Sequence, residues 1–283
     1  MSPERASSDP SSHREPLLAA VLQMNASSDA AGNWRQARDL VARAAAAGAR
    51  RVATPENTNY LGPHEEKVRL AETLDGPTCE RFGGLARQHH LHLLLGSFNE
   101  RSADPQRCYN TSVLFGPDGS QLAIYRKIHL FDVDLSEQVS FQESRTVVAG
   151  EEPVVAATPW LALGLSICYD LRFPELYRRL VDAGAEALAV PSAFTLTTGR
   201  AHWYPLLRAR AIENQCYVLA PAQQGRHDDR GLRESFGHAM IIDPWGQVLA
   251  TVGEGPGLAL AEIDPARVQR LRRAMPVTDH RRL

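Results

Sequence analysis

The chain has 283 residues, of which 43% are hydrophobic and 23% charged, and its formal net charge is −2 at pH 7. This composition is typical of globular proteins, and it excludes the strongly basic surface that binds nucleic acids or acidic membranes. We therefore expect a small-molecule partner, and neither a nucleic acid nor a membrane.

Residues 1–16 are rich in Ser, Pro, Arg and Glu and contain no apolar segment. This pattern predicts a disordered lead-in rather than a signal peptide. Residues 17–283 contain no linker and are expected to form a single domain. No apolar run approaches the length of a membrane-spanning helix, so the expected location is the cytoplasm.

The cysteines and histidines show no metal-binding pattern. The four cysteines are Cys79, Cys108, Cys168 and Cys216. They form no C-x-x-C pair and no Cys/His spacing typical of zinc sites, so four free thiols are expected. His89, His90 and His92 could suggest a metal, but their position between a helix and a strand favours a solvated helix end. We expect no metal and no cofactor.

The first hundred residues alternate between strand and helix patterns. Short apolar runs at 16–23 and 51–54 predict strands, and helical spacing at 33–47 predicts a helix between them. A second helix is expected at 77–89, followed by an apolar strand at 91–98. This alternation predicts a sheet with helices packed against it.

Residues 109–115 and 121–127 flank a Gly-Pro-Asp-Gly turn, and together they predict a β-hairpin. Residues 128–144 follow no clear period and include several acidic side chains, so we expect an irregular loop. Loops of this length inside a domain usually have a function.

The second half of the chain repeats the alternation. Strands are expected at 161–167 and 186–191, and helices at 173–183 and 201–214. Four further strands and a closing basic helix are expected at 216–222, 235–242, 248–252, 258–263 and 265–274. Two similar halves without a linker predict two sheets that pack face to face, with helices outside.

Three chemically active side chains follow strand-like runs: Glu56, Lys127 and Cys168. In α/β proteins, strand ends are where side chains converge on a ligand. A carboxylate can accept the thiol proton, and an ammonium can stabilise the thiolate and an oxyanion, so the three suffice for acyl transfer. A helix beginning just after Cys168 would add backbone N–H groups and a helix dipole near its sulfur.

Spacing alone leaves a structural alternative open. In that interpretation Cys168 is a buried core thiol, Glu56 is a surface turn residue and Lys127 is an ordinary hairpin end.

Three segments around these residues resemble the signature segments of the nitrilase superfamily of carbon–nitrogen hydrolases. They are Thr54-Pro55-Glu56-Asn57, Tyr125-Arg126-Lys127-Ile128-His129-Leu130-Phe131-Asp132 and Ile167-Cys168-Tyr169-Asp170-Leu171-Arg172-Phe173-Pro174-Glu175. They occur in the order found in that superfamily, and the resemblance extends from about residue 17 to the C-terminus. The chain is most similar to the Nit branch, which includes deaminated-glutathione amidases and omega-amidases. Residues 223–227 and 253–258 favour the former.

This resemblance implies an α/β fold, a four-layer α-β-β-α sandwich, and a catalytic triad of Glu56, Lys127 and Cys168 that hydrolyses an amide through a thioester. It also implies a second catalytic glutamate between the lysine and the cysteine. Glu143 matches that position best, and Glu137 is the competitor.

The implied substrate-binding set has four members: Tyr169, Arg172, Phe194 and Thr198. The backbone N–H of Tyr169 is expected to bind the oxyanion together with Lys127. The guanidinium of Arg172 suits bidentate binding of a carboxylate, which favours monoamides of 2-oxo-dicarboxylic acids over nitriles. A structural salt bridge from Arg172 to Asp170 or Glu175 is the alternative.

The resemblance implies a small amide substrate, with deaminated glutathione favoured over 2-oxoglutaramate or an N-carbamoyl amide. A member of a different class, which binds a metabolite without catalysis, is disfavoured because Glu56, Lys127 and Cys168 are all present. Members of the superfamily form dimers or larger assemblies, so a homodimer or homotetramer is expected.

Overall fold

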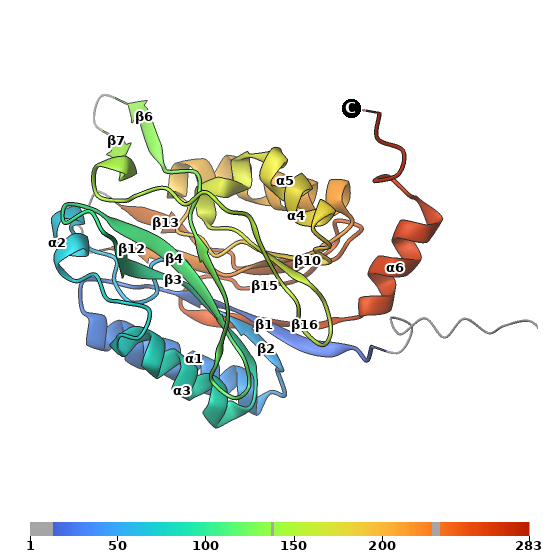
Figure 1. The fold of residues 1–283 in the computed structure, drawn as a ribbon, viewed down its shortest axis with the longest axis horizontal. Coiled ribbons are helices and arrows are strands. Elements are labelled where there is room, and N and C mark those ends of the chain that lie inside the picture. The colour runs from blue at the N-terminus through green and yellow to red at the C-terminus, as the bar shows by residue number, and fades with distance from the viewer. Residues whose placement is uncertain (1–13, 137–138, 228–232, 283) are drawn as a thin grey trace, which may run out of the picture.

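The computed structural model describes residues 14–136, 139–227 and 233–282. Two β-sheets pack face to face and helices cover their outer faces, so that the layers follow the expected order α-β-β-α (Figure 1). Most of the lead-in expected at residues 1–16 lies outside the described residues. At its end, Arg14 forms a two-pronged ion pair with Glu186, with N–O distances of 2.6 and 2.7 Å.

In the described part of the chain, the first sheet has eight strands in the order β13-β12-β1-β2-β3-β4-β5, and β16 pairs with β1. They are β1 (Leu17–Met24), β2 (Arg51–Ala53), β3 (His92–Arg101), β4 (Cys108–Phe115), β5 (Gln121–Arg126), β12 (Ala222–Arg226), β13 (Glu234–Phe236) and β16 (Gly257–Ile263). Strands β1, β2 and β3 are parallel, whereas β4 and β5 form the predicted hairpin.

The second sheet has the order β15-β14-β11-β10-β9-β8. Its strands are β8 (Val154–Ala156), β9 (Leu163–Leu165), β10 (Ala187–Ala189), β11 (Tyr217–Ala220), β14 (Met240–Ile242) and β15 (Val248–Thr251). The central strands β9, β10 and β11 are parallel. This is the arrangement expected where helices connect successive strands.

The helices are α1 (Ala30–Ala46), α2 (His64–Arg69), α3 (Pro77–His89), α4 (Pro174–Asp182), α5 (Leu196–Asn214) and α6 (Pro265–Ala274). Helices α1 and α3 cover the first sheet, and α4 and α5 cover the second (Figure 1). Within the described ranges, no helix is both long enough and apolar enough to cross a bilayer.

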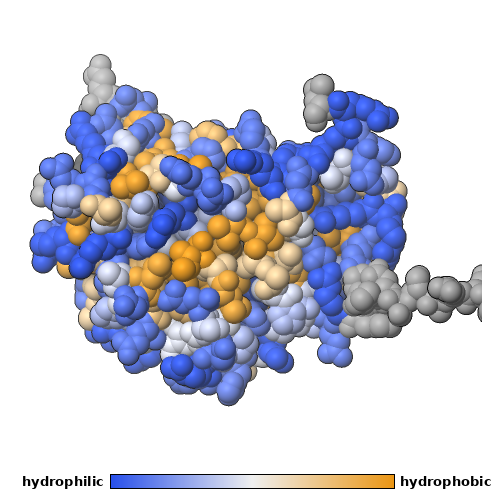
Figure 2. Space-filling model, in the orientation of Figure 1, coloured by the Kyte–Doolittle hydropathy of each residue, from blue (hydrophilic) through white to orange (hydrophobic). Residues whose placement is uncertain are grey.

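Strand β1 shows how the sequence builds two cores at once. Successive side chains of a strand point to opposite faces, so Val21 packs in the core between the two sheets, whereas Leu22 packs beneath α1 and α3. Figure 2 shows a hydrophobic band across one face of the molecule, between hydrophilic layers. The exposed Leu122 and Ile124 of the edge strand β5 contribute apolar surface where the helices leave the sandwich uncovered.

The prediction of an irregular loop is wrong for the segment 128–144. It contains the antiparallel ribbon of β6 (Asp132–Ser136) and β7 (Val139–Gln142), which then leads into a 3₁₀ turn at Glu143–Arg145. Val133 pairs with Phe141, while acidic side chains occupy alternate positions of β6. A ribbon this short has too few residues to show a clear period of two, so its composition suggests a loop.

The prediction of a single strand at 235–242 is also wrong, because this segment contributes one strand to each sheet. Gly237 and His238 have φ values of 77° and 58°, and this left-handed backbone ends β13 in the first sheet before β14 begins in the second. The strand expected at 216–222 likewise divides at Pro221 into β11 and β12. The chain therefore crosses twice between the sheets beside the candidate site.

Helix α5 begins five residues before the expected start at 201, because the Thr195 side chain accepts the Thr198 N–H and caps it. Helix α1 similarly begins at Ala30 rather than 33. The short helix α2 and strand β8 were not predicted from the sequence.

Candidate active site

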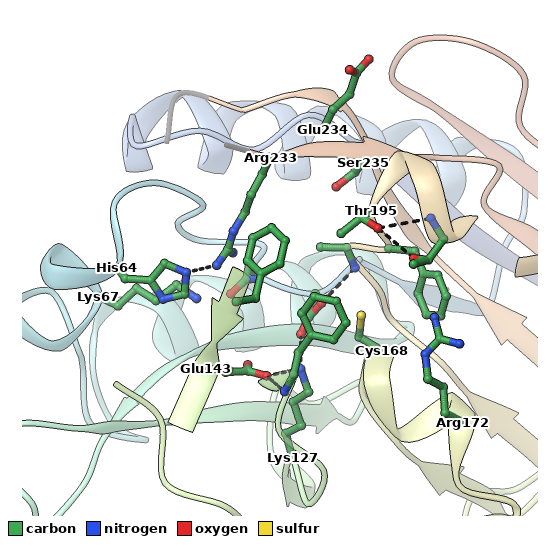
Figure 3. A pocket seen from close by; sticks show the side chains of 17 residues that line it. His64, Lys67, Lys127, Glu143, Cys168, Arg172, Thr195, Arg233, Glu234 and Ser235 are labelled. Carbon is green, nitrogen blue, oxygen red and sulfur yellow. Dashed lines mark hydrogen bonds and ion pairs between the residues drawn. The ribbon is translucent and has the colours of Figure 1, made fainter. Parts of the chain in front are cut away.

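A pocket opens where strands of both sheets end. It receives residues that follow β2, β5, β9 and β10, and α2 and the β6–β7 ribbon close its other side (Figure 3). The lining residues that concern its chemistry are Glu56, His64, Lys67, Lys127, Phe131, Phe141, Glu143, Cys168, Arg172, Ala193, Phe194, Thr195, Thr198, Arg233, Glu234 and Ser235.

The four predicted catalytic side chains lie together at the base of this pocket. The Lys127 ammonium donates to Glu56 Oε1 at 3.0 Å and to Glu143 Oε2 at 2.8 Å. The Cys168 thiol lies close enough to both groups for the Glu56 carboxylate to raise its pKa and the Lys127 ammonium to lower it. All four are buried, with at most 8% of any of them exposed. The structure thus places a carboxylate, an ammonium and a thiol in mutual contact.

Backbone and amide donors hold the Glu56 carboxylate in position. Glu56 Oε2 accepts the Ala193 N–H at 2.9 Å, and Oε1 accepts the Asn110 side-chain amide at 3.0 Å. Gln223 donates to the Glu56 carbonyl at 2.9 Å. The carboxylate therefore has little rotational freedom, and one oxygen faces both Lys127 and Asn110.

Gly96 allows β3 to approach the turn that carries Glu56. A Cβ at position 96 would lie 1.9 Å from the Thr54 carbonyl oxygen. The Gly96 N–H also donates to Thr54 Oγ1 at 2.9 Å. No side chain fits between these two backbones, so Gly96 fixes the height of the Glu56 turn above the sheet.

We expect Gly96→Ala to lower the free energy of unfolding by at least about 3 kcal/mol, because the backbone of the Glu56 turn must move to relieve the clash. Urea denaturation measures this loss. Gly84→Ala is the matched control, since a Cβ at position 84 of α3 would meet nothing within 4 Å. It should stabilise the helix slightly. Equal stability of the two variants would contradict this account.

Glu143 is bound as firmly as Glu56. Its Oε2 accepts the Phe131 N–H at 2.7 Å in addition to Lys127, and its Oε1 accepts the Asn110 amide at 3.3 Å. Asn110 therefore links both glutamates. Asn110 was not predicted as a site residue, because it stands beside the polar Thr111 and Ser112 in β4 and no local pattern distinguishes it from them. The competitor Glu137 lies outside the described residues.

Burial and charge set the protonation states. Burial opposes the charge on Lys127, but Glu143 and Glu56 outweigh it and raise the pKa of Lys127 above its ordinary value. Burial also opposes the charge on Glu143, yet Lys127 and then Lys67 hold the pKa of Glu143 below its ordinary value. The buried lysine and Glu143 therefore both remain ionised at neutral pH.

The thiol has the opposite tendency. Burial and the neighbouring Glu56 raise the pKa of Cys168 well above its ordinary value, and this effect exceeds the lowering by Lys127. The resting group is therefore a neutral thiol, which needs a base in contact with it before the sulfur can attack. Glu56 is that base by position.

Cys168 sits on a strained turn rather than at the start of a long helix. Its φ is 50°, a left-handed conformation that side chains other than glycine rarely adopt. It is the first residue of a 3₁₀ helix at Cys168–Arg172, and α4 begins only at Pro174. In place of the expected helix dipole, the turn offers the Tyr169 N–H, because the Cys168 N–H donates to the Pro191 carbonyl and the Asp170 N–H to the Ile167 carbonyl.

Asp170 ties this turn to the strand that precedes Lys127. Its fully buried carboxylate accepts the Ile167 N–H at 2.8 Å, the Tyr125 hydroxyl at 2.7 Å and the His129 N–H at 3.0 Å. His129 Nδ1 also lies 2.7 Å from Asp170 Oδ1. The carboxylate thus fixes the distance between the two halves of the triad.

Arg172 lines the pocket and does not form the alternative salt bridge. Its guanidinium lies over the Phe194 ring at 5.2 Å and 3.2 Å from His202 Nδ1. Among the described residues, no ion pair joins it to Asp170 or Glu175. The guanidinium therefore faces the pocket without a carboxylate partner.

The other predicted substrate contacts divide into two groups. Phe194 and Thr198 line the pocket, and the Thr198 hydroxyl lies 2.8 Å from that of Thr195. The Tyr169 ring packs instead against Phe131, with ring centroids 5.0 Å apart, and is not part of the lining. Only its backbone N–H, the group named in the prediction, remains available for an oxyanion.

The side of the pocket that α2 and β7 form was not predicted from the sequence. His64 and Lys67 come from α2, Phe141 comes from β7, and Arg233 precedes β13. Arg233 contacts His64 and lies 5.4 Å from the Phe141 ring centroid. Burial, then Lys67 and Arg233, lower the pKa of His64 to about 3, so His64 is neutral at pH 7. These residues were missed because neither α2 nor the ribbon was predicted.

Over residues 14–136, 139–227 and 233–282, no group of three or more His, Cys, Asp or Glu side chains is arranged to hold a metal ion. The four cysteines are free and buried.

Comparison with known proteins shows that the chain is similar to hydrolases in sequence and in fold. The sequence model of the carbon–nitrogen hydrolase family matches residues 18–273. The chain is 47% identical over 270 residues to a deaminated glutathione amidase of Synechocystis sp., covering 94% of this chain and 98% of that protein.

Two solved structures are similar. The C. elegans NitFhit protein has a TM-score of 0.89 and 42% identity over 95% of this chain, which spans 66% of that longer protein. A mutant amidase from Nesterenkonia sp. AN1 has a TM-score of 0.77 and 26% identity, covering 94% of this chain and 97% of that one. In that amidase the acetamide moiety of fluoroacetamide is attached covalently to the active-site cysteine.

Proposed function

Because the chain belongs to the carbon–nitrogen hydrolase family, it is an enzyme that hydrolyses a carbon–nitrogen bond, and we propose that its substrate is deaminated glutathione. The Synechocystis relative carries this activity in its name. The observation that carries the proposal is the pocket itself. Cys168, Glu56 and Lys127 lie at its base, and Arg172 faces it without a carboxylate partner among the described residues.

In this proposal, the Cys168 sulfur attacks the amide carbonyl carbon while its proton passes to Glu56. The carbonyl oxygen becomes an oxyanion, which the Lys127 ammonium and the Tyr169 N–H stabilise. The oxyanion collapses, the C–N bond breaks, and Glu56 returns the proton to the departing amine. The product of this half-reaction is a thioester between the 2-oxo acid and Cys168.

A water molecule then attacks the thioester while Glu56 accepts its proton, and the acid leaves as the thiol is restored. Glu143 positions Lys127 rather than transferring protons, because its carboxylate binds the Lys127 ammonium while Glu56 is the carboxylate that acts on the Cys168 thiol. Arg172 holds the carboxylate of the acyl group, with Phe194 and Thr198 beside it.

The test compares two substrates that share this acyl group. We expect kcat/KM for dipeptide release from deaminated glutathione to exceed that for ammonia release from 2-oxoglutaramate by at least about tenfold, a preference worth about 1.4 kcal/mol. The reverse order would identify an omega-amidase. No turnover of either, with slower alkylation of Cys168 in their presence, would indicate a member that binds the metabolite without catalysis.

We also propose a cytoplasmic location and a homodimer or homotetramer. Four free cysteines support a reducing compartment. The exposed Ile212 of α5 and the exposed Trp245 of the β14–β15 turn offer apolar surface for self-association.

A further inference from the structure

Lys67 is a second buried lysine in the pocket, and within the part of the chain that the structure describes its ammonium has no hydrogen-bond or ion-pair partner. Only 2% of the residue is exposed, and it lines the cavity. Across the described residues, no hydrogen bond or ion pair is recorded for its ammonium, whereas Lys127 binds two carboxylates. The neighbouring Arg69 on α2 is exposed and pairs with Glu66. Lys67 therefore differs from Lys127, the other lysine of the chain, whose charge two carboxylates balance.

An unpaired ammonium in such a place weakens the fold, since burial disfavours its charge. Burial, followed by the charge of Arg233, lowers the pKa of Lys67 to about 8, which still leaves most of it protonated at neutral pH. The negative charge of Glu143 acts in the opposite direction and raises the pKa of Lys67. The Glu143 oxygens, however, are bound to Lys127, Asn110 and the Phe131 N–H. A bound anion would supply the missing partner.

The neighbours of Lys67 suit a carboxylate. His64 is neutral, Arg233 adds a second positive charge, and Phe141 gives an apolar surface beside them. Glu234 also belongs to the lining, but Figure 3 shows its carboxylate directed away from this group. This side of the pocket is therefore positive and partly apolar.

Figure 3 also shows His64 and Lys67 on one side of the pocket and Arg172 on the other, with Cys168 and Lys127 between them. A substrate whose amide carbonyl lies at Cys168 extends in both directions. In the proposed function, Arg172 holds the acyl side, so the departing amine lies toward Lys67.

We propose that Lys67 binds a carboxylate on the departing amine, so that the site selects amides with a carboxylate on each side of the scissile bond. This inference rests on the proposed function and adds the specificity for the leaving group. A carboxylated dipeptide such as the amine of deaminated glutathione has the required group, whereas the ammonia released from 2-oxoglutaramate has none.

The experiment replaces Lys67 with methionine, which keeps the length of the side chain and removes its charge. We expect kcat/KM for deaminated glutathione to fall roughly 10- to 100-fold, as for the loss of a hydrogen bond between charged groups. For 2-oxoglutaramate it should change by less than about twofold. Lys67→Arg should recover part of the activity on deaminated glutathione. Arg69→Met, which removes a charge on the exposed face of α2, should leave kcat/KM unchanged for both substrates.

The midpoint temperature of thermal unfolding distinguishes a loss of substrate binding from a loss of structure. Lys67→Met should keep or raise it, because an unpaired buried charge is removed. An equal loss on both substrates, a fall of several degrees in the midpoint, or no change on either substrate would each overturn the inference. If the wild type hydrolyses deaminated glutathione but the variants show no selective effect, only this inference fails. If the wild type does not hydrolyse it, the proposed function fails first.

Discussion

Cys168→Ala is expected to lower kcat for deaminated glutathione by at least about 10⁴-fold, because the sulfur forms the covalent bond to substrate in the proposed mechanism. The fold should persist, since the substitution removes one atom from a residue already held by its backbone. The Cys168 N–H donates to the Pro191 carbonyl at 3.0 Å, and the Asp170 contacts do not involve the thiol.

Cys216→Ala provides the matched control for this prediction. Cys216 is also a free buried thiol, and burial raises its pKa to about 12, but it lies outside the pocket lining. This variant should lose some stability and keep kcat. Mass spectrometry of the wild type during turnover should find the acyl group on Cys168 alone. Wild-type turnover by Cys168→Ala would exclude the thioester mechanism.

The triad was predictable because each member follows a segment with a clear local pattern. The apolar runs before Glu56 and Cys168 and the hairpin before Lys127 appear in the structure as β2, β9 and β5. Strands β2 and β5 belong to the first sheet and β9 to the second, and the face-to-face packing of the sheets brings the residues that follow these strands together at the pocket. The resemblance to the nitrilase superfamily then distinguished a nucleophile from a core thiol.

The rest of the site depends on contacts that leave no local pattern. Helix α2 has six residues, too few for helical spacing to identify it, so the burial of Lys67 could not be anticipated. The alternative of a salt bridge from Arg172 considered only charges nearby in sequence, whereas the Asp170 carboxylate binds Tyr125 and His129, which lie about forty residues earlier. The left-handed backbone at Cys168 is likewise set by the tertiary structure.

Lys127→Met is the second substitution with a large expected effect. It removes an oxyanion donor from the proposed mechanism, which typically lowers kcat by about 10²–10³-fold. It also leaves Glu56 and Glu143 buried on either side of Asn110 without the cation that both contact. Breaking a buried ion pair by removing one partner costs about 3–5 kcal/mol. Lys67→Met, which removes the unpaired lysine, should show no such loss.

The pH dependence of stability tests whether this loss comes from the two carboxylates. In the wild type the pKa of Glu143 is lowered despite its burial, so its contribution to stability is present above the unfolded-state value of about 4.3 and is lost as the pH falls below it. Without Lys127, burial and the neighbouring Glu56 carboxylate should raise the pKa of Glu143 above that value.

The folded variant should then take up a proton more readily than its unfolded chain as the pH falls from 7 to 5. Its deficit relative to the wild type should shrink by up to about 1.4 kcal/mol for each pH unit over which one additional proton is bound. Urea denaturation of both proteins at pH 7 and pH 5 measures this difference. A deficit that is equal at the two pH values would mean that Lys127 stabilises the fold through packing, and that the two glutamates do not depend on its charge.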